Sequence, residues 1–326
     1  MKLGMTSEKG KGKIAIIGSG LIGKSWSVLF CRAGYEVCLY DIDEKQVSNA
    51  LSGILESLKE LEGKGLLKNS IMKSAEEAHK LVHGCDDIAK AIEGADYVQE
   101  NTPENIDVKK KIFGNLDNLV KNEHTIIASS TSCIVPSRFT EKLEHRKQCI
   151  VAHPVNPPHY VPLVEIVPAP WTDSSVVERT KAIMKDIGQA PVILNKEVNG
   201  FLLNRMQYAI IMEGWRLVED GVCSPEDVDT VMSKGLGLRY SFMGPFETMH
   251  LNAGGILDYC VKYGSNIEKI CENQSGSRQL HGSNTARVIH DAMCKTSVPV
   301  DNLDERRTWR DKRLAALAVH QAGQQD

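Results

Sequence analysis

The chain has 326 residues, of which 42% are hydrophobic and 25% are charged, and its formal net charge is −3. This composition is ordinary for a globular protein, and the length suits two domains of roughly 150 residues each. The small negative charge gives no electrostatic case for nucleic-acid binding, and no apolar run approaches the length of a membrane span.

Residues 1–12 carry charge but lack the apolar region of a signal peptide, so we expect a short flexible lead. The nine cysteines are odd in number and scattered, without a CxxC pair. Their spacing therefore predicts neither a disulfide framework nor a metal site. Unpaired cysteines are typical of reducing compartments, so the sequence predicts a cytoplasmic protein.

Residues 13–41 have the order of elements that a dinucleotide site requires. An apolar strand at residues 14–17 leads into GSGLIG at 18–23, which opens a helix with an apolar stripe. A second apolar strand at residues 37–40 ends on Asp41, 18 residues after the last glycine. This combination of strand, glycine turn, helix, strand and acid is far more specific than a glycine motif alone.

Each part of this segment has a physical task. Gly18 permits a tight turn, Gly20 lets the backbone approach a pyrophosphate, and Gly23 lets the helix pack closely on the strand. Asp41 would accept hydrogen bonds from the adenosine ribose, and the acids that follow it would repel a 2′-phosphate. The segment therefore predicts NAD rather than NADP. The contacts expected from it are Gly18, Gly20, Leu21, Ile22, Gly23 and Asp41.

Strands and helices alternate through the rest of the first half, which predicts a parallel, doubly wound sheet. We expect strands at 97–98, 125–128, 149–152, 163–167 and 191–194, and helices at 43–61, 88–92, 105–119, 136–143 and 174–187. Residues 68–84 are expected to form a further helix that returns antiparallel.

The pattern changes after about Lys196, because no convincing strand follows. A long helix is expected from Phe201 to Glu219, and Ser224-Pro225 is a typical helix start. The predicted fold is therefore α/β: a doubly wound Rossmann-type NAD domain at 13–196, an all-helical C-terminal domain at 197–319, and a polar tail at 320–326.

Four polar residues stand where they could carry out chemistry. Ser132 and His153 each follow a predicted strand, at the carboxyl edge where open sheets bind ligands. Glu165 lies inside an apolar strand, where an acid needs a partner, and Asn204 is near the start of the long helix. Each residue alone could have an ordinary structural role, and their joint placement beside a nucleotide fold is what draws attention.

These residue types suit the oxidation of a secondary alcohol. Histidine can take the hydroxyl proton, because its pKa lies near working pH. A carboxylate on the far ring nitrogen fixes the tautomer and stabilises the imidazolium. A serine and an asparagine can then hold the substrate oxygen.

The chain resembles the 3-hydroxyacyl-CoA dehydrogenase family along nearly its whole length. The matching segments are GSGLIG (18–23), SSTSC (129–133), HPVNPP (153–158), LVE (163–165), NGFLLNR (199–205) and MGPFE (243–247). The resemblance implies an NAD domain followed by a helical domain that pairs into a homodimer. It assigns the base to His153, the orienting acid to Glu165, the substrate-oxygen contacts to Ser132 and Asn204, and NAD contacts to Asp41, Glu104 and Lys109.

The expected substrate is a free hydroxy acid. The acyl-CoA enzymes carry two aromatic residues where Pro154-Val155 stand here. The segments VAHPVNPPHYVPLVEIVP, GLGLRYSFMGPFETMHLNAGG and RRTWRD resemble the branch of the family that oxidises the 3-hydroxyl of L-gulonate to 3-dehydro-L-gulonate. We hypothesise that Arg239 binds the substrate carboxylate, because its planar fork matches that group, although it could equally face solvent.

Three alternatives stay open at this stage. One is an acyl-CoA substrate, since the lysines scattered between residues 59 and 80 could contact the phosphates of CoA. Another is a protein accumulated for bulk, as in the eye lens, or an NAD-binding module without essential catalysis. The third is cysteine catalysis, for which Cys133 beside Ser132 is a weak candidate.

Overall fold

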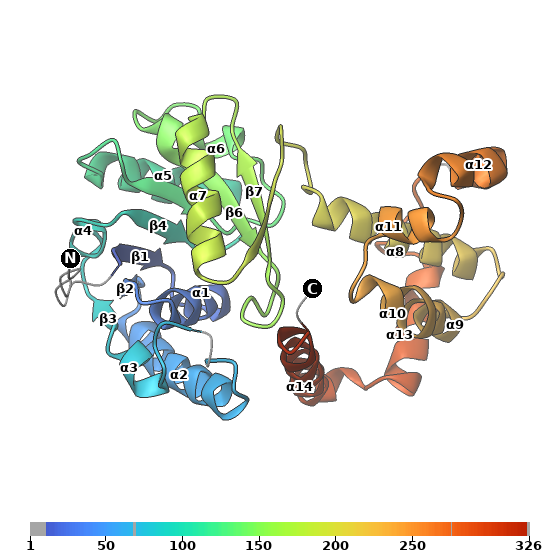
Figure 1. The fold of residues 1–326 in the computed structure, drawn as a ribbon, viewed down its shortest axis with the longest axis horizontal. Coiled ribbons are helices and arrows are strands. Elements are labelled where there is room, and N and C mark those ends of the chain that lie inside the picture. Colours follow the sequence, from blue (N-terminus) through green and yellow to red (C-terminus); the bar gives the residue numbers. More distant parts are fainter. Residues whose placement is uncertain (1–10, 68–69, 275, 325–326) are drawn as a thin grey trace, which may run out of the picture. The chain divides into compact units, whose positions relative to one another are not determined.

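The computed structural model divides into two compact units (Figure 1). The first unit holds the residues up to Asn204 together with 310–326, and the second unit is residues 205–309. The described residues are 11–67, 70–274 and 276–324. Most of the lead expected at residues 1–12 lies outside them.

The C-terminal helix explains why the units differ from the domains expected from the sequence. Sequence reasoning ended the first domain near Lys196 and kept residues up to 319 in the second. Helix α14 (Leu303–Ala322) instead joins the first unit from Arg310 onward. Its Ala315 is fully buried in the core of that unit, so apolar burial ties the last turns of the chain to the nucleotide-binding fold.

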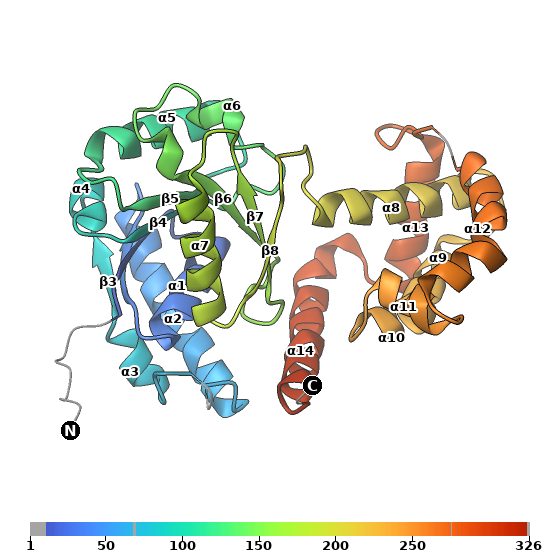
Figure 2. The ribbon, with the colours of Figure 1, turned by 45° about the horizontal axis from the view of Figure 1, so that its top comes forward.

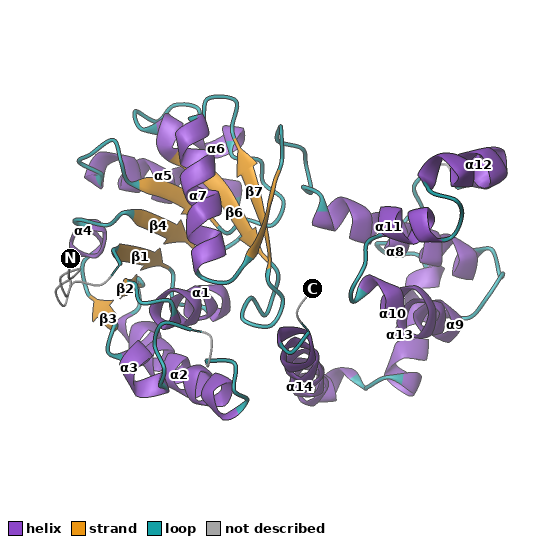
Figure 3. Cartoon of the chain, in the orientation of Figure 1, coloured by secondary structure: helices purple, strands orange, loops and turns teal. Residues whose placement is uncertain are grey.

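All strands of the described chain belong to one sheet with the order β3-β2-β1-β4-β5-β6-β7-β8 (Figure 3). Neighbours run parallel except β6 and β7, which pair antiparallel. The order in which strands are added reverses between β1 and β4, and such sheets bind ligands at this switch point. The strands are β1 Lys13–Ile17, β2 Glu36–Tyr40, β3 Val82–Cys85, β4 Tyr97–Glu100, β5 Ile126–Ser129, β6 Cys149–Pro154, β7 Leu163–Pro168 and β8 Ala190–Ile193.

Helices cover both faces of this sheet (Figure 2). Successive strand residues point to opposite faces, so Ile14 and Ile16 of β1 join one core, and Ala15 and Ile17 join the other. Helices α1, α2, α3 and α7 contribute to the first core, and α4, α5 and α6 to the second. Their bounds are α1 Leu21–Arg32, α2 Glu44–Gly63, α3 Ala75–His79, α4 Ile88–Ile92, α5 Ile106–Leu119, α6 Ser137–Thr140 and α7 Ser174–Asp186, with a 3₁₀ turn η1 at Arg146–Gln148.

Helix starts follow the polar residues that precede them. The Asp43 side chain accepts a hydrogen bond from the Lys45 N–H and caps α2, as expected from the sequence. In the second unit, Ser224 and Asp227 form a reciprocal capping box with Pro225 in the first turn of α9, which confirms that predicted helix start.

The described part of the second unit contains helices and no strand, as predicted. Helix α8 (Leu203–Glu219) begins in the first unit and continues into the second. It starts two residues later than expected, because Gly200 and Phe201 have positive φ values of 77° and 50°. The remaining elements are α9 Pro225–Thr230, the π-helical η2 Val231–Leu236, α10 Gly237–Tyr240, α11 Pro245–Leu251, α12 Ile256–Glu272, α13 Asn284–Thr296 and the 3₁₀ turn η3 Val300–Asn302.

Three predictions about local structure were wrong. Residues 82–85 form the edge strand β3 rather than the end of a helix, and α6 is shorter than 136–143. The sheet is not wholly parallel, because residues 155–162 connect β6 to β7 without a crossover helix, and a hairpin connection forces antiparallel pairing. Within the described ranges, every helix is too short or too polar to cross a bilayer.

Candidate active site

The glycine loop between β1 and α1 has the geometry that its sequence predicts. Gly18 has φ of 96°, which favours glycine, and a Cβ there would lie 2.9 Å from the Asn101 carbonyl oxygen. A Cβ on Gly23 would lie 1.9 Å from the Gly18 carbonyl oxygen, so only glycine lets α1 pack this closely on β1. Gly20 faces open space, with nothing within 4 Å of an added Cβ. The N-terminus of α1 is therefore accessible to an anionic group.

A cavity of about 760 Å³ opens beside this loop at the carboxyl ends of β1, β2 and β4. Asp41 lines it, and its Oδ2 accepts hydrogen bonds from the Ser19 N–H at 2.7 Å and the Ser19 hydroxyl at 2.9 Å. Apolar side chains from Ile42, Ile88 and Val108 form part of the wall. An acid anchored beside a glycine loop and an apolar wall suits the adenosine half of NAD.

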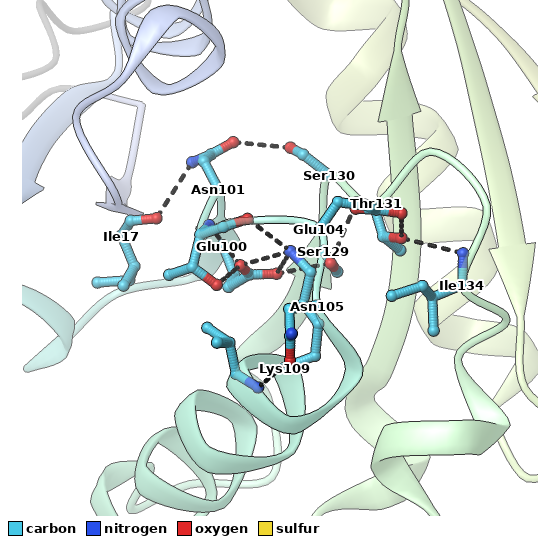
Figure 4. A network of polar contacts seen from close by, with 12 residues as sticks. Ile17, Glu100, Asn101, Glu104, Asn105, Lys109, Ser129, Ser130, Thr131 and Ile134 are labelled. Carbon is cyan, nitrogen blue, oxygen red and sulfur yellow. Dashed lines mark hydrogen bonds and ion pairs between the residues drawn. The ribbon is translucent and has the colours of Figure 1, made fainter.

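A buried ion pair supports the floor of the site (Figure 4). Lys109 of α5 contacts both carboxylate oxygens of Glu100 at 2.8 and 2.9 Å, and both side chains are at most 1% exposed. Ser129 donates to Glu100 at 2.6 Å, and Lys109 also donates to the Thr102 carbonyl at 2.9 Å. Because the two charges have several hydrogen-bond partners, this pair fixes the segment after β4 that reaches the site.

A second polar network lies at the centre of the edge. The Ser130 hydroxyl accepts from the Trp26 indole at 2.9 Å and from the Gln99 amide at 2.7 Å, and it donates to Asn101 Oδ1 at 2.7 Å. Asn101 and Thr102 line both the nucleotide cavity and a second cavity. This network therefore fixes the position where the two cavities meet.

Glu104 organises the turn that carries Ser132. Its Oε1 accepts from the Thr131 hydroxyl at 2.5 Å and from the Ser132 and Cys133 N–H groups at 3.2 and 3.3 Å. Burial opposes the charge of Glu104, but hydrogen bonds from Thr131 and Cys133 outweigh it and hold the pKa of Glu104 below its ordinary value. Glu104 is thus a carboxylate that holds the 131–133 turn at the cavity wall.

His153 and Glu165 face each other across the β6–β7 hairpin. They are directly opposite in the antiparallel register, and His153 Nδ1 lies 2.8 Å from Glu165 Oε2. The hydrogen bond expected from the sequence is therefore present. Both residues are buried, with 6% and 1% exposure, and the His153 ring lies 5.7 Å from that of Phe201.

The start of α8 completes the surroundings of Glu165. Glu165 Oε1 accepts from the Leu202 and Leu203 N–H groups at 2.7 and 2.9 Å. Burial opposes its charge, but the hydrogen bonds from His153, Leu203 and Leu202 outweigh burial and lower the pKa of Glu165. Since an ionised Glu165 only accepts hydrogen bonds, His153 donates from Nδ1, and in the neutral ring Nε2 carries the lone pair.

The second cavity, of about 350 Å³, lies in front of His153. Ser132, Asn204 and Glu104 also line it, so the first unit brings together all four residues to which chemistry was assigned. The Asn204 amide donates to the Ser132 carbonyl at 2.8 Å, which leaves one amide proton and its carbonyl oxygen for other partners. Among the described residues, no hydrogen bond to His153 Nε2 is present, so this nitrogen is available to a substrate.

Three further residues considered from the sequence, Lys109, Arg239 and Cys133, line neither of these two cavities. Lys109, expected to contact NAD, is buried in its pair with Glu100 and lines neither cavity. Arg239 is exposed on α10 of the second unit, and its contact with the substrate stays a prediction. Cys133 donates from Sγ to Glu104 at 3.3 Å, and burial and Glu104 raise its thiol pKa, which opposes a role as an activated thiolate.

Sequence reasoning missed Glu100, Asn101 and Ser130. A signal for the first was available, because Glu100 ends an apolar strand and Lys109 follows on the next helix, where a buried acid and a buried lysine require each other. Ser130 and Asn101 have no such signal, since their partners lie far away in the chain.

Family models cover most of the chain. The NAD-binding domain of 3-hydroxyacyl-CoA dehydrogenase matches residues 13–198, and the C-terminal domain of the same enzyme matches residues 200–276. The chain belongs to the 3-hydroxyacyl-CoA dehydrogenase family. It is an NAD-dependent oxidoreductase of the 3-hydroxyacyl dehydrogenase type, and the cavity beside Gly20 and Asp41 fits that cofactor.

Members of the family from distant organisms are similar over nearly the full length. Lambda-crystallin of Oryctolagus cuniculus is 50% identical over 94% of this chain and 95% of its own length. L-carnitine dehydrogenase of Oceanobacillus iheyensis is 34% identical over 94% of this chain and 96% of its own. The solved structure of 5-formyl-3-hydroxy-2-methylpyridine 4-carboxylic acid 5-dehydrogenase, described as an NAD⁺-dependent dismutase, has a TM-score of 0.81 and 27% identity, and the match covers 96% of this chain and 99% of that chain.

Proposed function

We propose that this enzyme oxidises the 3-hydroxyl of L-gulonate to 3-dehydro-L-gulonate with NAD. The observation that carries the proposal is the His153–Glu165 pair at 2.8 Å, with the second ring nitrogen available at a cavity that Ser132 and Asn204 also line. This is the arrangement that removal of a hydroxyl proton requires.

The proposed chemistry divides into three tasks for the protein. NAD, when bound, supplies the hydride acceptor. His153 takes the hydroxyl proton at Nε2, while Glu165 keeps the Nδ1 proton in place and stabilises the imidazolium that forms. The Ser132 hydroxyl and the free Asn204 amide proton hold the substrate oxygen and orient it toward the base.

Three observations favour a free hydroxy acid over an acyl-CoA. Pro154 and Val155 line the reaction cavity where the sequence resemblance would place two aromatic residues in acyl-CoA enzymes. Lys59 and Lys64, considered as partners for CoA phosphates, pair with Glu76 and Glu60. One relative that is similar over 94% of this chain is named for a free 3-hydroxy acid, L-carnitine.

Initial rates of NAD reduction with L-gulonate, L-carnitine, 3-hydroxybutyrate and 3-hydroxybutyryl-CoA test the substrate class. We expect kcat/KM to be highest for L-gulonate and lowest for the CoA thioester. A preference for 3-hydroxybutyryl-CoA would refute the proposed substrate and leave only the reaction type.

Arg239 remains the proposed partner of the substrate carboxylate, on the strength of its guanidinium fork. Arg239→Met should raise the KM for L-gulonate by about tenfold or more, as for the loss of a hydrogen bond to a charged group, with little effect on the KM for NAD. Unchanged KM and kcat values for L-gulonate would remove Arg239 from the site.

A homodimer is proposed from the apolar surface of α12. None of its residues is buried, and Leu257 and Val261 are 84% and 86% exposed. Exposed apolar faces of this kind mark association surfaces, and a second copy of the chain is the partner expected for this family. Sedimentation equilibrium of the wild type and of a Leu257→Glu/Val261→Glu variant tests it, since a dimeric wild type should become monomeric.

The cytoplasmic location stays a prediction.

A further inference from the structure

A third cavity in the first unit, of about 430 Å³, has no role in the proposed reaction. It shares no lining residue with either cavity of the active site. Its wall comes from the C-terminal ends of α1 and α7, the chain after α2, the β6–β7 connection and the end of α14. Five segments therefore enclose a space large enough for a small organic molecule.

Two buried polar atoms at this cavity lack a hydrogen-bond partner within the described chain. Gln189 is 7% exposed, and its Oε1 is unpaired. The Nδ1 of His159 is also buried and unpaired. Buried polar atoms are nearly always hydrogen-bonded, so two unpaired atoms at one cavity indicate that something else provides their partners.

Arg32 adds an unbalanced positive charge to the same wall. Among the described residues, its side chain makes one hydrogen bond, from Nη2 to the Ile187 carbonyl at 3.3 Å, and no carboxylate lies within ion-pair distance. Burial lowers the pKa of this guanidinium, and the weaker opposing effect comes from the Cys31 thiol rather than from a carboxylate. A guanidinium has five N–H donors, so most of its hydrogen-bonding capacity remains unused.

The neighbouring charges are already balanced. Asp186, which lines the cavity, pairs with Lys11 at 2.6 Å and accepts from the Tyr35 hydroxyl at 2.9 Å. Tyr160 donates to Glu60, which also pairs with Lys64. Arg32 is therefore the cation at this wall that lacks a counter-charge among the described residues. One cation suits a singly charged anion better than a phosphate dianion.

We propose that this cavity binds a small hydroxy carboxylate as a second, non-catalytic ligand. The carboxylate pairs with the Arg32 fork, whose planar donors match its two oxygens. A ligand hydroxyl donates to Gln189 Oε1, and His159 takes part in a further hydrogen bond through Nδ1. The site does not depend on the proposed reaction, because it uses none of the active-site residues.

His159 supplies a local reporter for this site. Burial and the nearby Arg32 lower its pKa to about 4, against the opposing effect of Glu60 and Asp311, so its ring is neutral at pH 6.5. The experiment follows the His159 Cε1–H signal by NMR in the full-length wild type at that pH, with assignment from a His159→Gln spectrum. D-gluconate is the probe, and D-sorbitol is its neutral counterpart with the same carbon chain.

We expect D-gluconate to shift the His159 signal in a saturable manner and D-sorbitol to leave it unchanged. Arg32→Met should weaken gluconate binding by about tenfold or more, as for the loss of a charge-assisted hydrogen bond. Arg179→Met, which removes the same charge from α7 outside the cavity, should not weaken it. Gln189→Leu should weaken it less than Arg32→Met does, and it decides the question if Arg32→Met fails to fold.

Three results would overturn the proposal. The first is the absence of a saturable His159 shift with gluconate. The second is equal binding of gluconate and sorbitol, which would remove the carboxylate from the recognition. The third is equal affinity in the wild type and in the folded Arg32→Met or Gln189→Leu proteins. Any of these results would leave the proposed reaction untouched, because that reaction uses other residues and is tested separately by NAD reduction.

Discussion

The two ends of the ligand-binding sheet edge are built in different ways. At the β1–β2 end, one continuous segment ending at Asp41 supplies the glycine turn and the acid of the nucleotide site, and it relies on the absence of side chains at Gly18, Gly20 and Gly23. At the β6–β7 end, four separated segments meet around His153 and Glu165, joined by hydrogen bonds from side chains and backbone groups. The first end depends on backbone shape, whereas the second depends on the charge and protonation of a few groups.

The largest effect should come from the β6–β7 end. Replacing the base, as in His153→Gln, should lower kcat for L-gulonate by about 10³-fold or more, because a general base contributes on that scale. NAD affinity should stay within about twofold, since His153 does not line the nucleotide cavity. Stopped-flow NADH formation and NAD titration measure the two quantities. A kcat within tenfold of wild type would show that proton removal does not depend on this ring.

The β1–β2 end should respond to shape alone. In Gly23→Ala the new Cβ would lie 1.9 Å from the Gly18 carbonyl oxygen, so the backbone must shift, at a cost of roughly 1–3 kcal/mol or more of unfolding free energy. Gly20→Ala is the matched control, because nothing lies within 4 Å of its added Cβ. It should change stability by only about 0.5 kcal/mol but still weaken NAD binding.

Urea unfolding and NAD titration of both glycine variants check this contrast. Equal stability losses in Gly23→Ala and Gly20→Ala would contradict the close packing of α1 on β1 as the reason for glycine at position 23.

The smallest expected effect is the pH dependence of the unfolding free energy that comes from the β6–β7 end. The folded-state pKa of Glu165 lies below the ordinary value of 4.5, so its interactions stabilise the fold fully above that pH. This contribution is lost as the pH falls through the lowered pKa. The difference in unfolding free energy between wild type and Glu165→Gln should therefore shrink on acidification from pH 6 to pH 3. A constant difference over that range would mean that Glu165 is not held as a carboxylate.

This contrast also explains how much the sequence could predict. The β1–β2 end can be predicted from the sequence, because its strand, glycines, helix and acid are neighbours in the chain. Each of them has a local physical reason for its place there. The predicted cap of α2 at Asp43 follows the same logic. Strand β3 was missed because its residues, Val82 to Cys85, include a histidine and a glycine and only one fully buried side chain.

At the β6–β7 end, the sequence predicts which residues take part but not how they are arranged in space. The resemblance assigned roles to His153 and Glu165, yet a wholly parallel sheet would not have placed them opposite each other. The antiparallel hairpin does, because directly opposed residues bring their side chains within about 5 Å. The positive φ of Phe201, which turns two N–H groups toward Glu165, is likewise set by tertiary packing and has no sequence signature.

The most direct test of the proposed base is the position of the proton on the His153 ring in the NAD complex at neutral pH, measured by ¹⁵N NMR. The expected result is a protonated Nδ1 and a bare Nε2 in the wild type, with mixed tautomers and a kcat about a hundredfold lower in Glu165→Gln. A wild-type ring protonated on Nε2 alone would contradict the assignment of His153 as the group that accepts the substrate proton.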